Sequence, residues 1–166
     1  MMPRVLSVAT FGTALGSALM SGAFFAFSTF VMKALGTVPP AQAVRAMQAM
    51  NVWAPTGLFL TALLGTALAC AALTFEAVLG WSEPGASLRL AGSLAYLLGA
   101  FGVTMMANVP RNDALATLEP DSANTVAAWM EYLSGWTAWN HVRTVAALLA
   151  TALLILSMLS SGGADR

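Results

Sequence analysis

Four long apolar segments constrain this 166-residue chain more than any other feature of its sequence. They cover residues 5–31, 54–79, 88–107 and 142–159. A helix of about 20 largely apolar residues is long enough to cross a lipid bilayer, and it satisfies its own backbone hydrogen bonds there. We therefore predict an all-α integral membrane protein, a four-helix bundle in which residues 1–166 form one four-span domain.

The composition points to the lipid bilayer as the main partner. Hydrophobic residues make up 58% of the chain and charged residues only 8%, too few to cover the surface of a soluble domain. The formal net charge is zero and there is no basic stripe, which argues against a nucleic-acid partner. The single cysteine, Cys70, lies in an apolar run and can form neither an internal disulfide nor a thiolate metal site by itself.

The connections between the spans differ in length. A tight turn at residues 83–85 joins the second span to the third. The other two connections are longer, and we expect a short interfacial helix in each of them, at residues 41–50 and 122–132. Four antiparallel spans put both termini on one side of the membrane, so the two longer connections lie together on the other side.

Most of the unusual polar residues fall at the side with the longer connections. After the third span, Pro110 should interrupt the helix and leave two asparagines on irregular backbone. Such backbone either lines a cavity at membrane depth or simply forms a turn. The polar residues of this side that are candidates for ligand binding are Ser28, Gln48, Asn51, Asn108 and Asn112.

The segment from Trp136 to Arg143 concentrates polar chemistry where the fourth span begins. On one regular helix, Trp136, Trp139, Asn140 and Arg143 lie within roughly 100° of one another, whereas His141 projects to a different side. The helix therefore either starts near Asn140 or offers two different surfaces.

Each of these side chains has a structural and a functional interpretation. The two indoles could anchor a helix at the membrane interface or stack on a flat ligand. Asn140 could cap the fourth helix. Arg143 could reach lipid headgroups, or it could hold an anion with a forked pair of hydrogen bonds. His141 is the only histidine of the chain, and histidine is the side chain that exchanges protons near neutral pH.

The sequence carries no pattern for a bound metal or nucleotide. One histidine, one cysteine and scattered carboxylates do not supply three or four metal ligands at a usable spacing. Glycine-rich phosphate loops and dinucleotide-binding fingerprints are also absent from it. We therefore expect no metal and no cofactor.

Four segments carry a resemblance to a known family, namely Phe27–Met32, Ala46–Asn51, Asn108–Asn112 and Trp136–Arg143. In this order, over nearly the whole chain, they resemble the anthrone oxygenase-like family of small four-span membrane proteins, most of them bacterial. One departure is Lys33, where many relatives carry proline. The resemblance implies a location in the bacterial inner, or cytoplasmic, membrane.

The resemblance also implies an activity, because fungal members oxidise anthrones to anthraquinones with dioxygen and without a metal or flavin. This chain would then be a cofactor-independent oxygenase of a lipophilic aromatic compound that is anthrone-like or quinone-like. His141 would be the base, and Asn140 and Arg143 would donate to the enolate oxygen. Aromatic walls and further donors would come from Trp136, Trp139, Asn108 and Asn112.

A non-enzymatic role is the alternative. The same polar face could dock a ligand or partner in a membrane binding subunit or a small-molecule carrier. Carriers often break their helices near the bilayer midplane, whereas this chain has its helix-breaking residues at one end. Stripes of small residues, for example Gly57, Thr61, Gly65 and Ala69, favour close helix packing, either within one chain or between copies in a homo-oligomer.

Overall fold

The computed structural model describes residues 4–162 as helices joined by short connections. Four helical rods are long and apolar enough to cross a membrane: Arg4–Leu35, Gly57–Leu79, Ala86–Ala116 and Thr125–Ser160. The predicted all-α four-helix bundle is therefore confirmed, and the chain is an integral membrane protein. The elements in chain order are α1 (Arg4–Ala26), the π-helix η1 (Phe27–Val31), α2 (Met32–Leu35), α3 (Pro40–Trp53), α4 (Gly57–Leu79), α5 (Ala86–Leu94), the π-helices η2 (Ala95–Gly102) and η3 (Thr104–Asn108), α6 (Val109–Ala116) and α7 (Thr125–Gly162).

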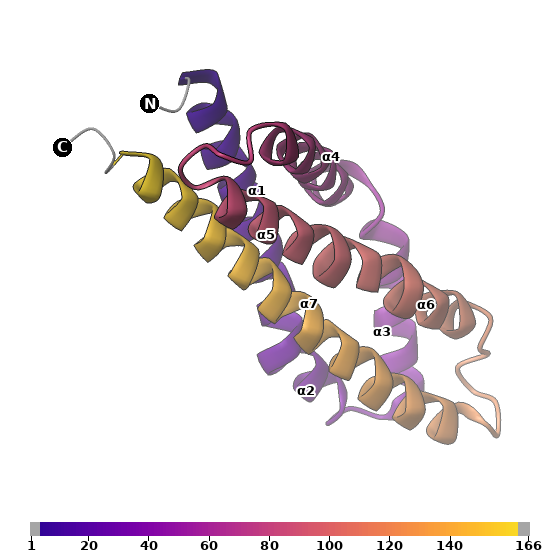
Figure 1. Ribbon diagram of the computed structural model, residues 1–166. Coiled ribbons are helices and arrows are strands. Elements are labelled where there is room, and N and C mark those ends of the chain that lie inside the picture. Colours follow the sequence, from indigo (N-terminus) through magenta and orange to yellow (C-terminus); the bar gives the residue numbers. More distant parts are fainter. Residues whose placement is uncertain (1–3, 163–166) are drawn as a thin grey trace.

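The two longer connections lie at one end of the bundle, as predicted, while α1 begins and α7 ends at the opposite end (Figure 1). α7 packs against α1 on one side and against α5 and η2 on another, and α4 contacts α1 and α5. The tight turn between α4 and α5 ends at Gly85, whose φ of 81° is in the left-handed region that glycine adopts without steric penalty.

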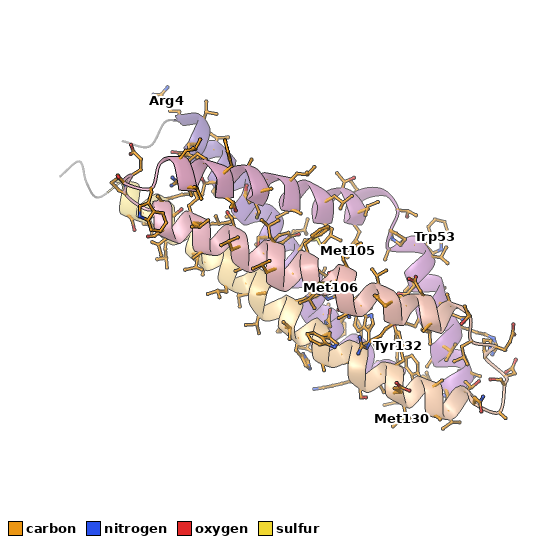
Figure 2. All side chains as sticks on the ribbon, turned by 45° about the vertical axis from the view of Figure 1, so that its right-hand side comes forward. Arg4, Trp53, Met105, Met106, Met130 and Tyr132 are labelled. Carbon is orange, nitrogen blue, oxygen red and sulfur yellow. The ribbon has the colours of Figure 1, made fainter. Side chains whose placement is uncertain are left out.

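Large apolar side chains cover the outside of the rods. Leu68, Phe75, Leu98, Met106 and Leu148 are between 60% and 84% exposed. Figure 2 shows such side chains projecting from the bundle along its length. In water this surface would be unfavourable, so it agrees with a bilayer around the bundle.

Small polar side chains hold α1 against α7. The Ser17 hydroxyl donates to the backbone carbonyl of Ala147 at 2.9 Å, and the Ser21 hydroxyl donates to that of Thr144 at 3.3 Å. In lipid, where apolar contacts give no net driving force between helices, such close, hydrogen-bonded approaches stabilise helix pairs.

Of the two short helices predicted in the longer connections, the first is observed and the second is wrong. The first is α3, which begins at Pro40. Proline is favourable there because the first N–H groups of a helix have no partner within the helix. There is no separate helix at residues 122–132, because α7 runs unbroken from Thr125 into the fourth span (Figure 1). Apolar content marks only part of this helix. Its polar beginning is helical because it packs into the protein, as the 2% exposure of Trp129 shows.

The third rod continues past Pro110, so the prediction of irregular backbone at Asn108 and Asn112 is also wrong. The turn before the proline is the π-helix η3, and the Val109 N–H bonds to the carbonyl of Thr104, five residues back. Pro110 is the second residue of α6, and because it has no N–H the rod lacks one backbone hydrogen bond at this point. The wide turn lets the helix accommodate the proline without ending.

The third rod buries residues at a spacing of four. Tyr96, Ala100, Thr104 and Asn108 are each at most 7% exposed. In a regular α-helix, positions four apart drift by about 40° at every step, which would carry Asn108 away from the side of Tyr96. The turns of η2 and η3 hold more residues than an α-helical turn and offset this drift. All four side chains therefore face the core.

Candidate functional site

The guanidinium of Arg143 lies at the centre of a buried polar cluster and is only 5% exposed. Its Nη2 donates to Oδ1 of Asn140 at 2.6 Å, and its Nη1 donates to Oγ1 of Thr104 at 3.2 Å. The guanidinium carbon lies 4.3 Å from the ring centre of Phe24 and 5.0 Å from that of Trp136. The cation is thus held by two hydrogen bonds and two aromatic rings.

Within residues 4–162, this buried charge has no carboxylate partner. The ion pairs among residues 4–162 are Arg45 with Asp121 and Arg89 with Glu76, and the Nε of Arg143 has no hydrogen-bond partner there. A cation within a membrane-spanning helix is costly, and the aromatic rings offset only part of that cost. An unneutralised intramembrane cation is therefore a candidate functional group.

Asn140 extends the cluster towards α1 and η1. Because arginine cannot accept a hydrogen bond, the Asn140 Oδ1 must face Arg143, and its Nδ2 faces the other way. Nδ2 donates to the Phe24 carbonyl and to Oγ of Ser28, each at 2.7 Å. Oγ of Ser28 lies 3.1 Å from Oγ1 of Thr144. A hydrogen-bonded path therefore runs from Arg143 to Ser28.

Trp136 is fixed from several sides. Its Nε1 donates to Oδ1 of Asn112 at 2.8 Å, and its backbone carbonyl accepts from Nδ2 of Asn108 at 3.2 Å. The Tyr132 hydroxyl donates to the same Asn112 oxygen at 2.9 Å, and the two rings stack 6.2 Å apart. The Oδ1 of the fully buried Asn108 has no hydrogen-bond partner within the described residues.

His141 lies outside this cluster, in a groove of about 680 Å³ between η1–α2 and α7. Thr137, one turn earlier on α7, lines the same groove, and its buried hydroxyl has no partner in the part of the chain that the structure describes. Hydroxyl, ammonium and imidazole groups thus share a volume that is typical of small-molecule sites. The residues that line the groove are Ser28, Thr29, Met32, Lys33, Gly36, Thr37, Leu133, Ser134, Thr137, Ala138 and His141.

Ser28 connects the two parts, because it lines the groove and also bonds to the Asn140 amide. On α7, Thr137 and His141 are one turn apart, as are Asn140 and Thr144, and these two adjacent rows form one stripe of the helix near Ser28. The histidine lies at the groove edge of this stripe, and the buried cation lies behind it.

The structure therefore links some of the predicted site residues and separates others. Contacts connect Ser28, Asn108, Asn112, Trp136, Asn140 and Arg143 to one another in the buried cluster.

Four predicted residues lie elsewhere. Trp139 is 40% exposed and is not among the residues that line the groove. Gln48 donates to the carbonyls of Leu115 and Leu118, each at 2.9 Å, and so ties α3 to the end of the third rod. The side chain of Asn51 lies beside Tyr132 at the edge of the cluster, but its Nδ2 has no hydrogen-bond partner within residues 4–162, and His141 lies in the groove.

The structure also settles the alternatives for Asn140 and Arg143. Asn140 caps no helix start, because α7 passes through it without a break. Arg143 does not reach outward, because its side chain is buried between two rings.

Sequence reasoning missed Thr104 and Phe24, which hold the guanidinium of Arg143. The signal for Thr104 was present, since it lies four residues before Asn108 in an otherwise apolar stretch. Phe24 is one apolar residue among many, and no sequence pattern distinguishes it.

Among residues 4–162, no group of three or more His, Cys, Asp or Glu side chains lies close enough together to hold a metal ion.

Comparison with known families finds one match. A family model described as anthrone oxygenase matches residues 50–153, which is more than half of the chain. The matched region includes Thr104, Asn108, Trp136, Asn140 and Arg143, and it begins after the segment that contains Ser28. No curated protein and no solved structure matches the chain.

Proposed function

The chain belongs to the anthrone oxygenase family, and from this premise we propose that it is a membrane-embedded oxygenase that oxidises a lipophilic, anthrone-like aromatic compound without a cofactor. One observation carries the proposal beyond the family. A buried guanidinium that has no carboxylate partner among residues 4–162 is connected, through Asn140 and Ser28, to a groove that contains the only histidine of the chain. We also propose that the protein resides in a bacterial inner membrane, where a lipophilic substrate would be concentrated.

The reaction needs a base and a site that tolerates negative charge. Removing one proton from the ring CH₂ of an anthrone gives a stabilised enolate, which transfers one electron to dioxygen. The substrate radical and superoxide then combine to a peroxide anion at the same carbon, and this anion takes back the proton from the base. Loss of water from the peroxide leaves the quinone carbonyl, so one dioxygen is consumed and one water is formed. The protein supplies proton transfer and electrostatic stabilisation.

In this proposal the groove residues contact the substrate. His141 takes the proton, and the free hydroxyl of Thr137 with the ammonium of Lys33 stabilises the enolate oxygen. Arg143 contributes its positive charge from behind, through Asn140 and Ser28, because electrostatic interactions extend further in a membrane interior than in water. This arrangement modifies the sequence-based hypothesis, in which Asn140 and Arg143 touched the enolate themselves.

Dioxygen uptake by the purified protein in detergent tests the proposal, with an anthrone as substrate. We expect wild-type protein to accelerate uptake and quinone formation. His141→Ala should lower the rate by at least about 100-fold, since positioned bases contribute about that much. Val142→Ala is the matched control, because Val142 is the neighbouring residue on α7 and is 43% exposed.

Two outcomes would contradict the proposal. Equal rates for wild type and His141→Ala would remove His141 as the base. No oxidation by the wild type would reject the oxygenase function and favour the alternative, a non-enzymatic membrane binding protein.

A further inference from the structure

The hydrogen-bonding capacity of Ser28 follows from its neighbours. Thr144 has one hydroxyl proton, which it donates to the backbone carbonyl of Asn140 at 2.9 Å. In the 3.1 Å contact between the two hydroxyls, Ser28 must therefore be the donor and Thr144 the acceptor. The proton of Ser28 is thus directed into the protein.

One of the two lone pairs of Ser28 is also used. The Asn140 Nδ2 donates to it at 2.7 Å, and the orientation of that amide is fixed because its oxygen accepts from Arg143. A hydroxyl offers one proton and two lone pairs. After both contacts, Ser28 retains a single lone pair and no free proton.

That lone pair is all that Ser28 can offer a molecule in the groove. Its side chain lines the groove and is only 6% exposed, so bulk solvent does not replace a missing donor easily. A buried acceptor left without a donor is unfavourable by an amount similar to a lost hydrogen bond. The unpartnered hydroxyl of Thr137 in the same groove is a second polar group that a ligand could satisfy.

We propose that Ser28 is a specificity-determining residue that accepts a hydrogen bond from a ring hydroxyl of the ligand. The inference rests on the proposed function only in taking the groove as the ligand site. It restricts the ligand class to lipophilic aromatic compounds with a free hydroxyl. A methyl ether at that position has no proton to donate, and an oxyanion there would face the lone pair. The oxygen that becomes negative must therefore point away from Ser28, towards Thr137 and Lys33.

The test compares two probes for binding to the full-length protein in detergent. One is an anthrone with a ring hydroxyl placed away from the carbonyl, so that it forms no internal hydrogen bond, and the other is its methyl ether. Affinity is measured under nitrogen by quenching of tryptophan fluorescence, so no oxidation occurs. For wild type we expect the hydroxyl compound to bind about three- to tenfold more tightly, as one net hydrogen bond allows.

Two serine variants then show whether Ser28 causes this preference. Ser28→Ala should bind both probes with equal affinity. Ser21→Ala is the matched control, because Ser21 lies on the same helical rod, also bonds to α7, and is not among the residues that line the groove. It should keep the wild-type preference.

Three results would overturn the inference: equal affinity of wild type for both probes, a preference that survives in Ser28→Ala, or no binding of either probe to wild type. The first and third results are measured on wild type alone, so they would overturn the inference even if Ser28→Ala did not fold. If the preference depends on Ser28 but wild type oxidises neither compound in air, the proposed oxygenase function fails while the inference about Ser28 stands.

Discussion

Replacing Arg143 with methionine should leave the stability of the protein nearly unchanged. The substitution removes two hydrogen bonds and two ring contacts. Thr104 remains satisfied, because its hydroxyl donates to the Ala100 carbonyl at 2.7 Å. The main local loss is the unpaired amide oxygen of Asn140, about 1–2 kcal/mol. The substitution also removes a buried charge, whose desolvation destabilises the folded protein by several kcal/mol. This gain offsets the loss. Methionine also packs well against aromatic rings. We expect a net change of no more than about 1 kcal/mol in the free energy of unfolding.

The same substitution should lower the oxidation rate clearly. If the reacting oxygen lies on the order of 10 Å from the guanidinium, one unit charge at an effective dielectric constant of about 20 contributes about 1.7 kcal/mol. The loss of that charge corresponds to a roughly 10- to 20-fold lower rate. Arg143→Lys keeps the charge, so it should retain more of the rate than Arg143→Met does.

Unfolding by a denaturing detergent in mixed micelles, followed by tryptophan fluorescence, measures the stability, and dioxygen uptake measures the rate. Arg89→Met is the matched control. Arg89 is 1% exposed but pairs with Glu76 at 2.6 Å, so its removal leaves a carboxylate without its partner. This control should lose about 2 kcal/mol of stability and keep its rate per folded molecule. If Arg143→Met instead unfolds more easily by about 3 kcal/mol, or if it keeps the full rate, Arg143 is a structural residue and the reasoning is refuted.

Two further predictions concern the packing of the bundle, and both are tested in the same unfolding assay. A Cβ added at Gly99 would lie 2.4 Å from Cβ of Ala146, so Gly99→Ala should destabilise the bundle by about 2 kcal/mol. Gly12→Ala has no atom within 4 Å of the added carbon and should not destabilise it; equal effects of the two would contradict close packing of η2 on α7. Asn112→Leu removes the shared acceptor of a buried tyrosine and a buried indole and should cost about 2–4 kcal/mol. Unchanged stability of that variant would mean that the two donors find other partners.

The sequence was sufficient to predict the four spans. It was also sufficient to predict which end of the bundle holds most of the polar residues. Apolar length and an even number of spans were sufficient, because a bilayer permits few alternatives to parallel rods. The ends of the rods were not predictable in this way. Thr125 begins α7 in polar sequence, and the helix continues past Pro110 because the preceding turn is a π-helix, which no apolar pattern indicates.

The site was predictable in part. Helical spacing correctly separated His141 from Trp136, Asn140 and Arg143, since angular position depends only on residue number once the helix is regular. Spacing could not show that Trp139, at the edge of the same arc, faces outward. The direction in which each amide and hydroxyl donates depends on partners from the first and third rods, and these partners become known only from the fold.

The wide turns of the third rod let it hold an extra residue without changing which side faces the core. Asn108 follows Tyr96 by twelve positions, which in a regular α-helix would turn it by about 120° away from the side of Tyr96. Eleven positions would turn it by only about 20°. Deleting one outward-facing residue, such as Leu98, which is 69% exposed, would therefore convert a wide turn into an ordinary one and leave Thr104 and Asn108 facing α7. We expect relatives that keep the arginine site to include chains that are one residue shorter over this stretch and α-helical throughout it.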